Sequence, residues 1–123
     1  MKKTNFKFSA IVIFSLFIII GCGDKYSKTN LYGDWSVSEW KVETSGKSIS
    51  NKMDMNFNAD DKYSIDYGSK KESGKYWISG DYLHTMAEGK SEMSVRIMKL
   101  NSDTLVIQMN RGGKMERVVL LKN

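Results

Sequence analysis

Residues 53–67 read MDMNFNADDKYSIDY, and this stretch decides the fold class of the chain. Apolar and polar side chains alternate over 53–57, and they alternate again over 63–67. A period of two is typical of a strand with one buried face, because successive side chains point to opposite sides. The short polar side chains at 58–61 favour a turn between the two segments. The stretch therefore predicts an antiparallel hairpin.

The same alternation continues along the rest of the chain. Further segments of this kind start at Trp35, Gly74, Tyr82, Met93, Leu105 and Met115. Together they indicate about eight strands joined in sequential hairpins. An up-and-down antiparallel β-barrel explains them best, since closure removes the exposed edges of an open sheet. The predicted class is all-β, and a sandwich of two sheets is the alternative.

Strand parity assigns one set of side chains to the interior of the barrel. Because the strands are short, we expect a barrel of modest height that side chains mostly fill, with a small cavity at most. Residues 115–121 are apolar on both faces, so their orientation stays open. The predicted inward set is Trp35, Val37, Met53, Met55, Phe57, Tyr63, Ile65, Tyr67, Tyr76, Ile78, Leu83, Met93, Val95, Ile97, Leu105 and Ile107.

The beginning of the chain has the pattern of a secretory signal peptide. A basic start precedes an apolar run over residues 8–20, which is shorter than the roughly 20 residues that span a bilayer. The tetrapeptide IIGC at 19–22 resembles a bacterial lipobox, which implies cleavage between Gly21 and Cys22 and attachment of lipid to the Cys22 sulfur. An ordinary buried cysteine, or a plain secretory signal with a chance cysteine near its cut, is the alternative.

This pattern divides the chain into a signal peptide (1–21), a lipidated tether (22–30) and one barrel domain (31–123). The tether is polar and has no period. Two or three acyl chains on Cys22 would hold the protein firmly on a membrane. We therefore expect a lipid-anchored protein of the bacterial cell envelope, in the outer membrane, with its membrane face left open. The sequence holds one cysteine, so no intrachain disulfide can form.

The charge of the chain does not indicate a nucleic-acid partner. The net charge of +5 falls to about +2 once the signal peptide and its three lysines are removed. The remaining bases, among them Lys62, Lys75 and Lys90, are dispersed along the sequence, which is typical of a solvated surface.

The sequence offers little support for catalysis or for a cofactor. His84 is the one histidine, so a metal site built from several imidazoles is excluded. Adjacent Asp60 and Asp61 are expected to be turn formers. Gly112 and Gly113 sit between two strands and do not open a helix, so they are no nucleotide-binding loop. We expect no enzyme, no metal and no cofactor.

Several segments resemble a known family. The sequence LYGDW at 31–35 is similar to the Gly-x-Trp opening of lipocalins and their bacterial lipocalin-like relatives. Residues 55–63, 74–83 and 100–106 are similar to later hairpins of these proteins. The resemblance implies a barrel closed at one end by Trp35. It also implies an arginine packed across that tryptophan, with Arg117 the first candidate and Arg111 the second.

Two functional hypotheses follow. The first is a binding module that holds a small lipophilic molecule at a barrel mouth lined by Met55, Phe57, Tyr63, Tyr76 and Met93. The second is an interaction or inhibitor module, with a filled barrel and no ligand, that binds another envelope protein. Trp77 motivates the second hypothesis, since it points outward if Tyr76 points inward, and tryptophan is enriched where partners bind. Trp40 would join it unless its strand carries a bulge after Val37.

Overall fold

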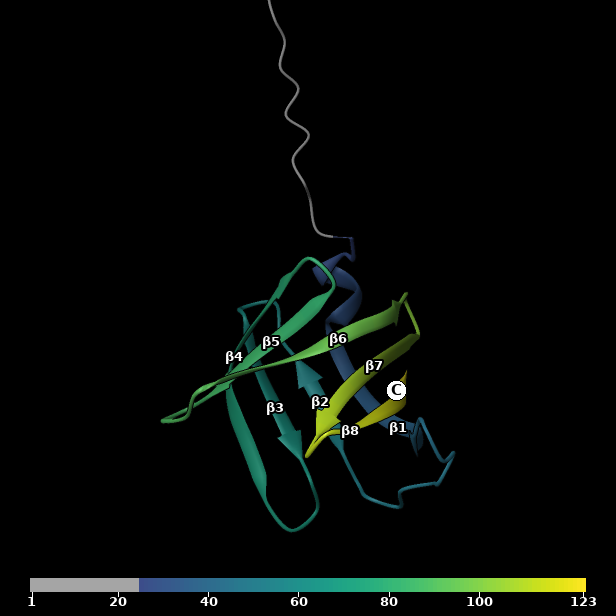
Figure 1. The fold of residues 1–123 in the computed structure, drawn as a ribbon. Helices are drawn as coiled ribbons and strands as arrows, with labels where there is room; N and C mark the ends of the chain where they lie inside the picture. The colour runs from purple at the N-terminus through teal and green to yellow at the C-terminus, as the bar shows by residue number, and fades with distance from the viewer. Residues whose placement is uncertain (1–24) are drawn as a thin grey trace, which may run out of the picture.

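The structure is a computed structural model that describes residues 25–123. The expected signal peptide and the lipidation of Cys22 lie outside these residues. Within the described part, the backbone forms eight strands and one short 3₁₀ helix, η2, and no helix there is long and apolar enough to cross a bilayer (Figure 1). The elements are η2 Lys28–Leu31, β1 Gly33–Val42, β2 Asp54–Phe57, β3 Lys62–Asp66, β4 Lys71–Ser79, β5 Tyr82–Ala87, β6 Glu92–Leu100, β7 Thr104–Arg111 and β8 Lys114–Lys122.

The strands form one closed antiparallel barrel in sequence order. Each strand pairs with the next, and β1 closes the barrel by pairing with β8. The predicted hairpin is β2–β3, in which Phe57 lies opposite Tyr63. Its turn contains Asp61 with a φ of 68°, a conformation that short polar side chains tolerate. The barrel prediction is confirmed, and the sandwich is not formed.

The interior of the barrel is packed with apolar side chains. Of the sixteen predicted inward residues, eleven are buried and four are partly buried against the core, whereas Met93 is 68% exposed. Phe57 and Tyr76 meet edge to face with their ring centroids 4.9 Å apart. In β8, Val118 and Leu120 point inward and Leu121 points outward, which settles the face that the sequence left open.

A β-bulge in β1 determines where Trp40 lies. The pairing of β1 with β8 shifts between Val37 and Glu39, so one extra residue reverses the parity of the strand. Trp40 consequently points into the barrel and is buried. It cannot contribute to an outer docking face.

The end of the barrel at the top of Figure 1 is closed by η2 and the start of β1. Leu31 and Trp35 are fully buried there, and the Trp35 indole Nε1 donates a hydrogen bond to the Leu31 carbonyl at 2.8 Å. Tyr26 also packs against the core. Tyr26 and η2 therefore pack against the barrel within the range that the sequence analysis assigned to the tether.

The cation that lies over Trp35 is a lysine. Lys122 pairs with Trp35 across β1–β8, and its Nζ lies 5.0 Å from the ring centroid. The same ammonium donates to the Asn30 carbonyl at 3.1 Å. The expectation that Arg117 packs across Trp35 is wrong, because Arg117 alternates with inward Val118 and so points outward.

Arg117 instead belongs to an exposed cluster on the outer face. Its Nε lies 3.2 Å from Glu43 Oε2, and Gln108 donates to the same carboxylate. The hydrogen bond from Gln108, ahead of the contact with Arg117, lowers the pKa of Glu43. Arg111, the second candidate, lies at the other end of the barrel from Trp35, over Trp40.

Candidate functional site

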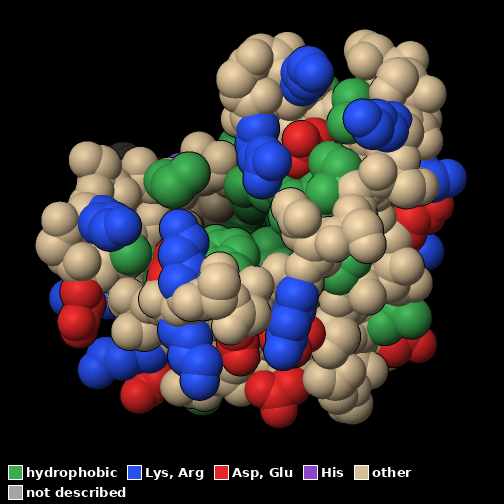
Figure 2. Space-filling model, turned by 90° about the horizontal axis from the view of Figure 1, so that it is seen from below, with side chains coloured by type: hydrophobic (Ala, Val, Ile, Leu, Met, Phe, Trp, Pro, Cys, Tyr) green, Lys and Arg blue, Asp and Glu red, His purple; other side chains and the backbone are tan. Residues whose placement is uncertain are grey.

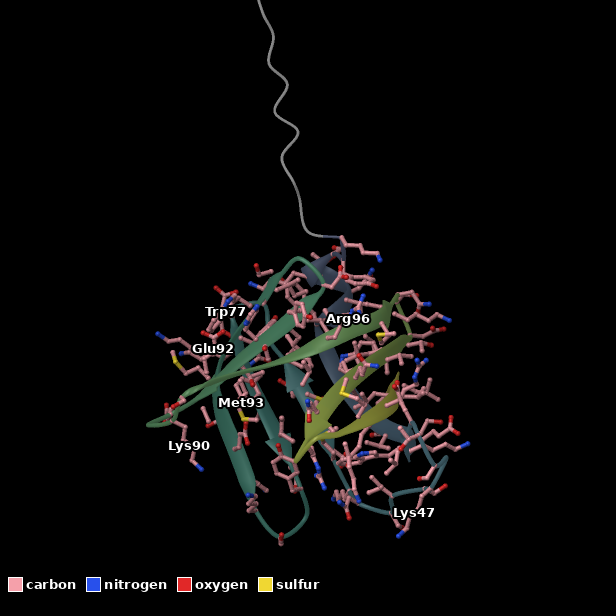
Figure 3. The ribbon with its side chains drawn as sticks, in the orientation of Figure 1. Lys47, Trp77, Lys90, Glu92, Met93 and Arg96 are labelled. Atoms are coloured by element: carbon pink, nitrogen blue, oxygen red, sulfur yellow. The ribbon has the colours of Figure 1, made fainter. Side chains whose placement is uncertain are left out.

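The five predicted ligand-lining residues do not form one site. Met55, Phe57, Tyr63 and Tyr76 are buried in the packed core, whereas Met93 is exposed. Met93 has inward parity, because it lies opposite Thr85 in the β5–β6 pair, but it sits near the start of β6, at the open end of the barrel (Figure 3). A mouth lined by all five side chains is therefore not present.

The open end is hollowed. Seen from below, this end shows hydrophobic side chains at the base of a depression, with Lys and Arg side chains around it (Figure 2). A cavity of about 260 Å³ is lined here by Tyr67, Lys70, Glu72, Thr85, Ala87, Lys90, Ser91 and Met93. These residues come from β4, β5 and β6 and from the β3–β4 and β5–β6 turns. We call this space the mouth cavity.

Glu72 is the acidic residue that lines the mouth cavity. It lies opposite Ile65 in the β3–β4 pair and shares the inward parity of Tyr76. Tyr63 donates its hydroxyl proton to Glu72 Oε2 at 2.6 Å, and Tyr67 donates to Oε1 at 3.3 Å. Each carboxylate oxygen thus has one donor from the barrel and a further lone pair for a ligand or water.

The tyrosines of the interior are held in their protonated form. Burial, followed by the nearby Glu72 charge, raises the pKa of Tyr67 to about 12. Burial and the hydrogen bond to Glu72 raise the pKa of Tyr63 as well. Both phenols therefore remain hydrogen-bond donors at neutral pH, which keeps the carboxylate of Glu72 in a fixed orientation.

A second interior carboxylate lies on β8. Glu116 is buried, with 4% of its surface exposed, and its Oε1 accepts a hydrogen bond from the Trp40 indole at 2.9 Å. Arg111 Nε lies 3.3 Å from the same oxygen, and its guanidinium lies 5.6 Å from the Trp40 ring centroid. A buried charge needs such partners, since its desolvation is costly.

A second hollow adjoins the mouth cavity. It has a volume of about 520 Å³ and is lined by residues that include Trp40, Lys52, Tyr67, Lys70 and Arg111. Tyr67 and Lys70 line both spaces, and Lys70 Nζ lies 5.6 Å from the Tyr67 ring centroid. The open end therefore combines aromatic walls, an interior carboxylate and a cationic rim.

Comparison with protein families assigns the chain. The lipocalin-like domain family matches residues 31–107. The chain belongs to this lipocalin-like family. Comparison of the lipocalin-like chain with curated proteins gives no match.

Two solved structures have the same fold as this lipocalin-like protein. A lipocalin-like protein from Bacteroides uniformis superposes with a TM-score of 0.61 at 15% identity, over 76% of this chain and 99% of the other. An uncharacterized protein from Bacteroides eggerthii superposes with a TM-score of 0.60 at 13% identity, over the same shares. At these identities, the likeness concerns the fold.

Neither interior carboxylate was among the residues predicted from the sequence. Glu116 alternates with Val118 and Leu120, and Glu72 lies two residues from Gly74 on the inward parity of β4. Parity would have placed Glu72 inside the lipocalin-like barrel, whereas the two apolar faces of residues 115–121 left Glu116 unassigned. Charged residues are rarely buried without a partner, so the residue types themselves did not indicate two carboxylates in the interior.

His84 and Trp77 lie on the outer face of the sheet. They face each other across β4–β5 with stacked rings, 5.3 Å between centroids, and His84 Nδ1 lies 2.7 Å from Glu92 Oε2. Trp77 is half-buried, and its neighbour Tyr82 is 45% exposed. In the described part of the chain, no group of three or more His, Cys, Asp or Glu residues is arranged to hold a metal ion.

Proposed function

We propose that this lipocalin-like protein is a lipid-anchored protein of the bacterial envelope that binds a small, partly apolar molecule at the open end of its barrel. The observation that carries the proposal is the mouth cavity, where an aromatic and methionine-lined wall meets a held carboxylate. The proposed role is binding without catalysis.

The dimensions of the site limit the ligand. The core below the mouth is filled by Phe57, Tyr76 and their neighbours, so no long apolar chain can enter the barrel deeply. Met93 and Tyr67 offer apolar contact near the surface, and methionine adapts its shape to different partners. We therefore favour a compact amphipathic ligand whose polar group reaches Glu72 or the cations of the rim.

Lipidation at Cys22 would orient the mouth cavity relative to the membrane. The described chain enters the barrel at the closed end, opposite the mouth cavity. Lys25 is three positions after Cys22, which corresponds to about 10 Å of extended chain. An anchored protein would then turn its closed end toward the membrane and its mouth away from it.

The two exposed methionines of the β5–β6 hairpin supply a matched test. Met93 lines the mouth cavity, whereas Met86 lies on the outer face. The mature chain, residues 22–123 with Cys22→Ser, is incubated with an envelope lipid extract and analysed by native mass spectrometry. We expect Met93→Gln with Tyr67→Gln to lose the bound species, and Met86→Gln to retain it. Equal occupancy in all three proteins would exclude the mouth as the site.

A second candidate function is docking of an envelope protein on the outer face of β4–β5. Trp77 and exposed Tyr82 favour it, since such aromatic residues are enriched at interfaces. Trp77→Ala should then reduce capture of a cross-linked partner without unfolding the barrel. Unfolding of this variant would show that Trp77 supports the fold and would remove the candidate.

A further inference from the structure

The barrel brings together three lysines that are far apart in the sequence. Lys62 in β3 lies directly opposite Lys75 in β4, and both border an outer groove of about 510 Å³ that also reaches Lys90. The groove lies on the outside of β3, β4 and β5, because Lys62 and Lys75 have the opposite parity to Tyr63 and Tyr76. It borders the mouth cavity, with which it shares Ala87 and Lys90. Its floor includes Met86 and Ala87.

None of these three ammonium groups has an acidic partner. Within residues 25–123, Lys62, Lys75 and Lys90 form no ion pair and no side-chain hydrogen bond, and Glu88 is the one carboxylate that lines the groove. Elsewhere on the surface, lysines such as Lys28, Lys41 and Lys52 pair with nearby carboxylates. The groove therefore keeps an excess of positive charge.

The pairing of Lys62 with Lys75 is unfavourable in the empty barrel. Like charges directly opposite each other on one face of an antiparallel pair destabilise the sheet. An anion placed between them would turn this repulsion into attraction. The next pair along the same face, Ser64 opposite Ser73, adds two hydroxyl donors that make no hydrogen bond within the described residues.

Gly74 gives the groove its shape. A Cβ at this position would lie 2.0 Å from the Met86 backbone oxygen, so only glycine allows β5 to approach β4 this closely. The approach places Met86 beside Lys75, its partner in the β4–β5 pair. The cationic groups and the apolar floor thereby line the same space.

We propose that this outer groove, centred on the Lys62–Lys75 pair beside the mouth cavity, is a second binding site, for a phosphoryl group. A phosphate monoester carries between one and two negative charges at neutral pH and three acceptor oxygens, which matches two facing ammonium groups and two hydroxyls. The phosphoryl group comes from a soluble phosphate ester or from a lipid headgroup. The Lys62–Lys75 pair and the two serines do not line the mouth cavity, so this site can be tested apart from the mouth.

Titration with a phosphate tests the site. The mature Cys22→Ser chain, ¹⁵N-labelled, is titrated with inorganic phosphate and pyrophosphate at low and physiological salt. We expect saturable shifts of the amides of Lys62, Ser64, Ser73 and Lys75. The double variant Lys62→Gln/Lys75→Gln should bind at least about tenfold more weakly, since each charged hydrogen bond contributes more than about 1.4 kcal/mol.

A matched pair of lysines controls for net charge. Lys47, on the opposite side of the molecule from Lys90 in Figure 3, and Lys114 are also exposed and without ion pairs within residues 25–123. The variant Lys47→Gln/Lys114→Gln loses the same charge and should bind phosphate within about twofold of the parent. Equal weakening in both double variants, or shifts that map elsewhere, would overturn the proposal.

Vesicles distinguish the two sources of the phosphoryl group. Co-sedimentation with phosphatidylcholine vesicles containing phosphatidic acid, lost in Lys62→Gln/Lys75→Gln but kept in the control, assigns a lipid headgroup. Saturable binding of soluble phosphate without co-sedimentation assigns a soluble ester. Absence of both kinds of binding would refute the site.

A charge-reversal variant distinguishes a role of Lys75 in phosphate binding from a role in the stability of the barrel. Lys75→Glu places a carboxylate opposite Lys62 and should raise Tm by about 1–4 °C while it abolishes phosphate binding. A lower Tm in this variant would contradict the inferred repulsion between the two lysines, and unchanged phosphate binding would contradict the site.

Discussion

At the scale of single residues, the two ends of the barrel are built around tryptophans with different partners. Trp35 at the closed end donates to Leu31 and lies beneath Lys122. Trp40 near the open end donates to Glu116 and lies beneath Arg111. The pairing of Trp35 with Lys122 identifies the cation over Trp35, whereas the family resemblance implied Arg117, and the two apolar faces of residues 115–121 left its orientation open in the sequence.

Lys122 is expected to stabilise the closed end, whereas Arg117 is not. Lys122→Met removes the ammonium from above Trp35 and its bond to Asn30, and should lower the free energy of unfolding by about 1 kcal/mol. Arg117→Met removes an exposed contact with Glu43 and should change it by less than about 0.5 kcal/mol. Urea unfolding followed by tryptophan fluorescence measures both. A larger loss in Arg117→Met would reverse the assignment.

The buried tyrosines predict a loss of stability at alkaline pH. The pKa values of Tyr67 and Tyr76 are raised to about 12, mainly by burial. A group whose pKa is raised on folding stabilises the protein fully below its unfolded pKa of about 10 and loses this contribution as pH rises toward the folded value. The urea midpoint should therefore fall between pH 10 and 12.

Phenylalanine variants check the origin of that fall. Tyr67→Phe and Tyr76→Phe remove one ionisable phenol each, so the dependence of the midpoint on pH should become shallower in both. A parent urea midpoint that stays constant up to pH 12 would contradict the destabilising ionisation of these tyrosines. Variants whose midpoint depends on pH as the parent's does would contradict it as well.

At the scale of elements, alternation predicted the strands well, because burial on one face imposes a period of two. It failed where the backbone departs from that period. The bulge after Val37 reverses the parity of β1 and buries Trp40. No residue type in this part of the sequence indicates a bulge. The mouth cavity was missed for a related reason: Met93 has inward parity, but parity does not tell how far a strand extends beyond the packed core.

The close approach of β5 to β4 at Gly74 can be tested by a single substitution. Gly74→Ala places a methyl group against the Met86 backbone and should lower the free energy of unfolding by about 1–3 kcal/mol, since the strand cannot move without breaking the β4–β5 pairing. Ser73→Ala, its exposed neighbour, should change it by less than about 0.5 kcal/mol. Equal stability of Gly74→Ala and the parent, measured by urea unfolding, would show that the close approach is relaxed in solution.

At the scale of the whole molecule, the start of the described chain and the proposed ligand site lie at opposite ends of a small, filled barrel. Sequence pattern was sufficient for the barrel because every hairpin is local and each strand pairs with the next. The site was less accessible to prediction, since its residues come from β4, β5, β6 and two hairpin turns, and strand alternation does not tell which side chains of neighbouring turns meet.

The anchor itself is testable by fractionation. Cys22→Ala should move the protein from the membrane fraction to the soluble envelope fraction and abolish incorporation of labelled palmitate, because Cys22 is the one thiol in the chain. Retention of Cys22→Ala in membranes would point to an uncleaved N-terminal segment as the anchor.

The most direct test of the central claim is an amide chemical-shift map of the mature Cys22→Ser chain with the small molecule recovered from the envelope extract. We expect shifts to concentrate on Tyr67, Glu72, Thr85 and Met93 at the open end, with little change around Trp77 on the outer face. Shifts centred on Trp77 and Tyr82, or no small molecule recovered at all, would contradict a ligand-binding mouth.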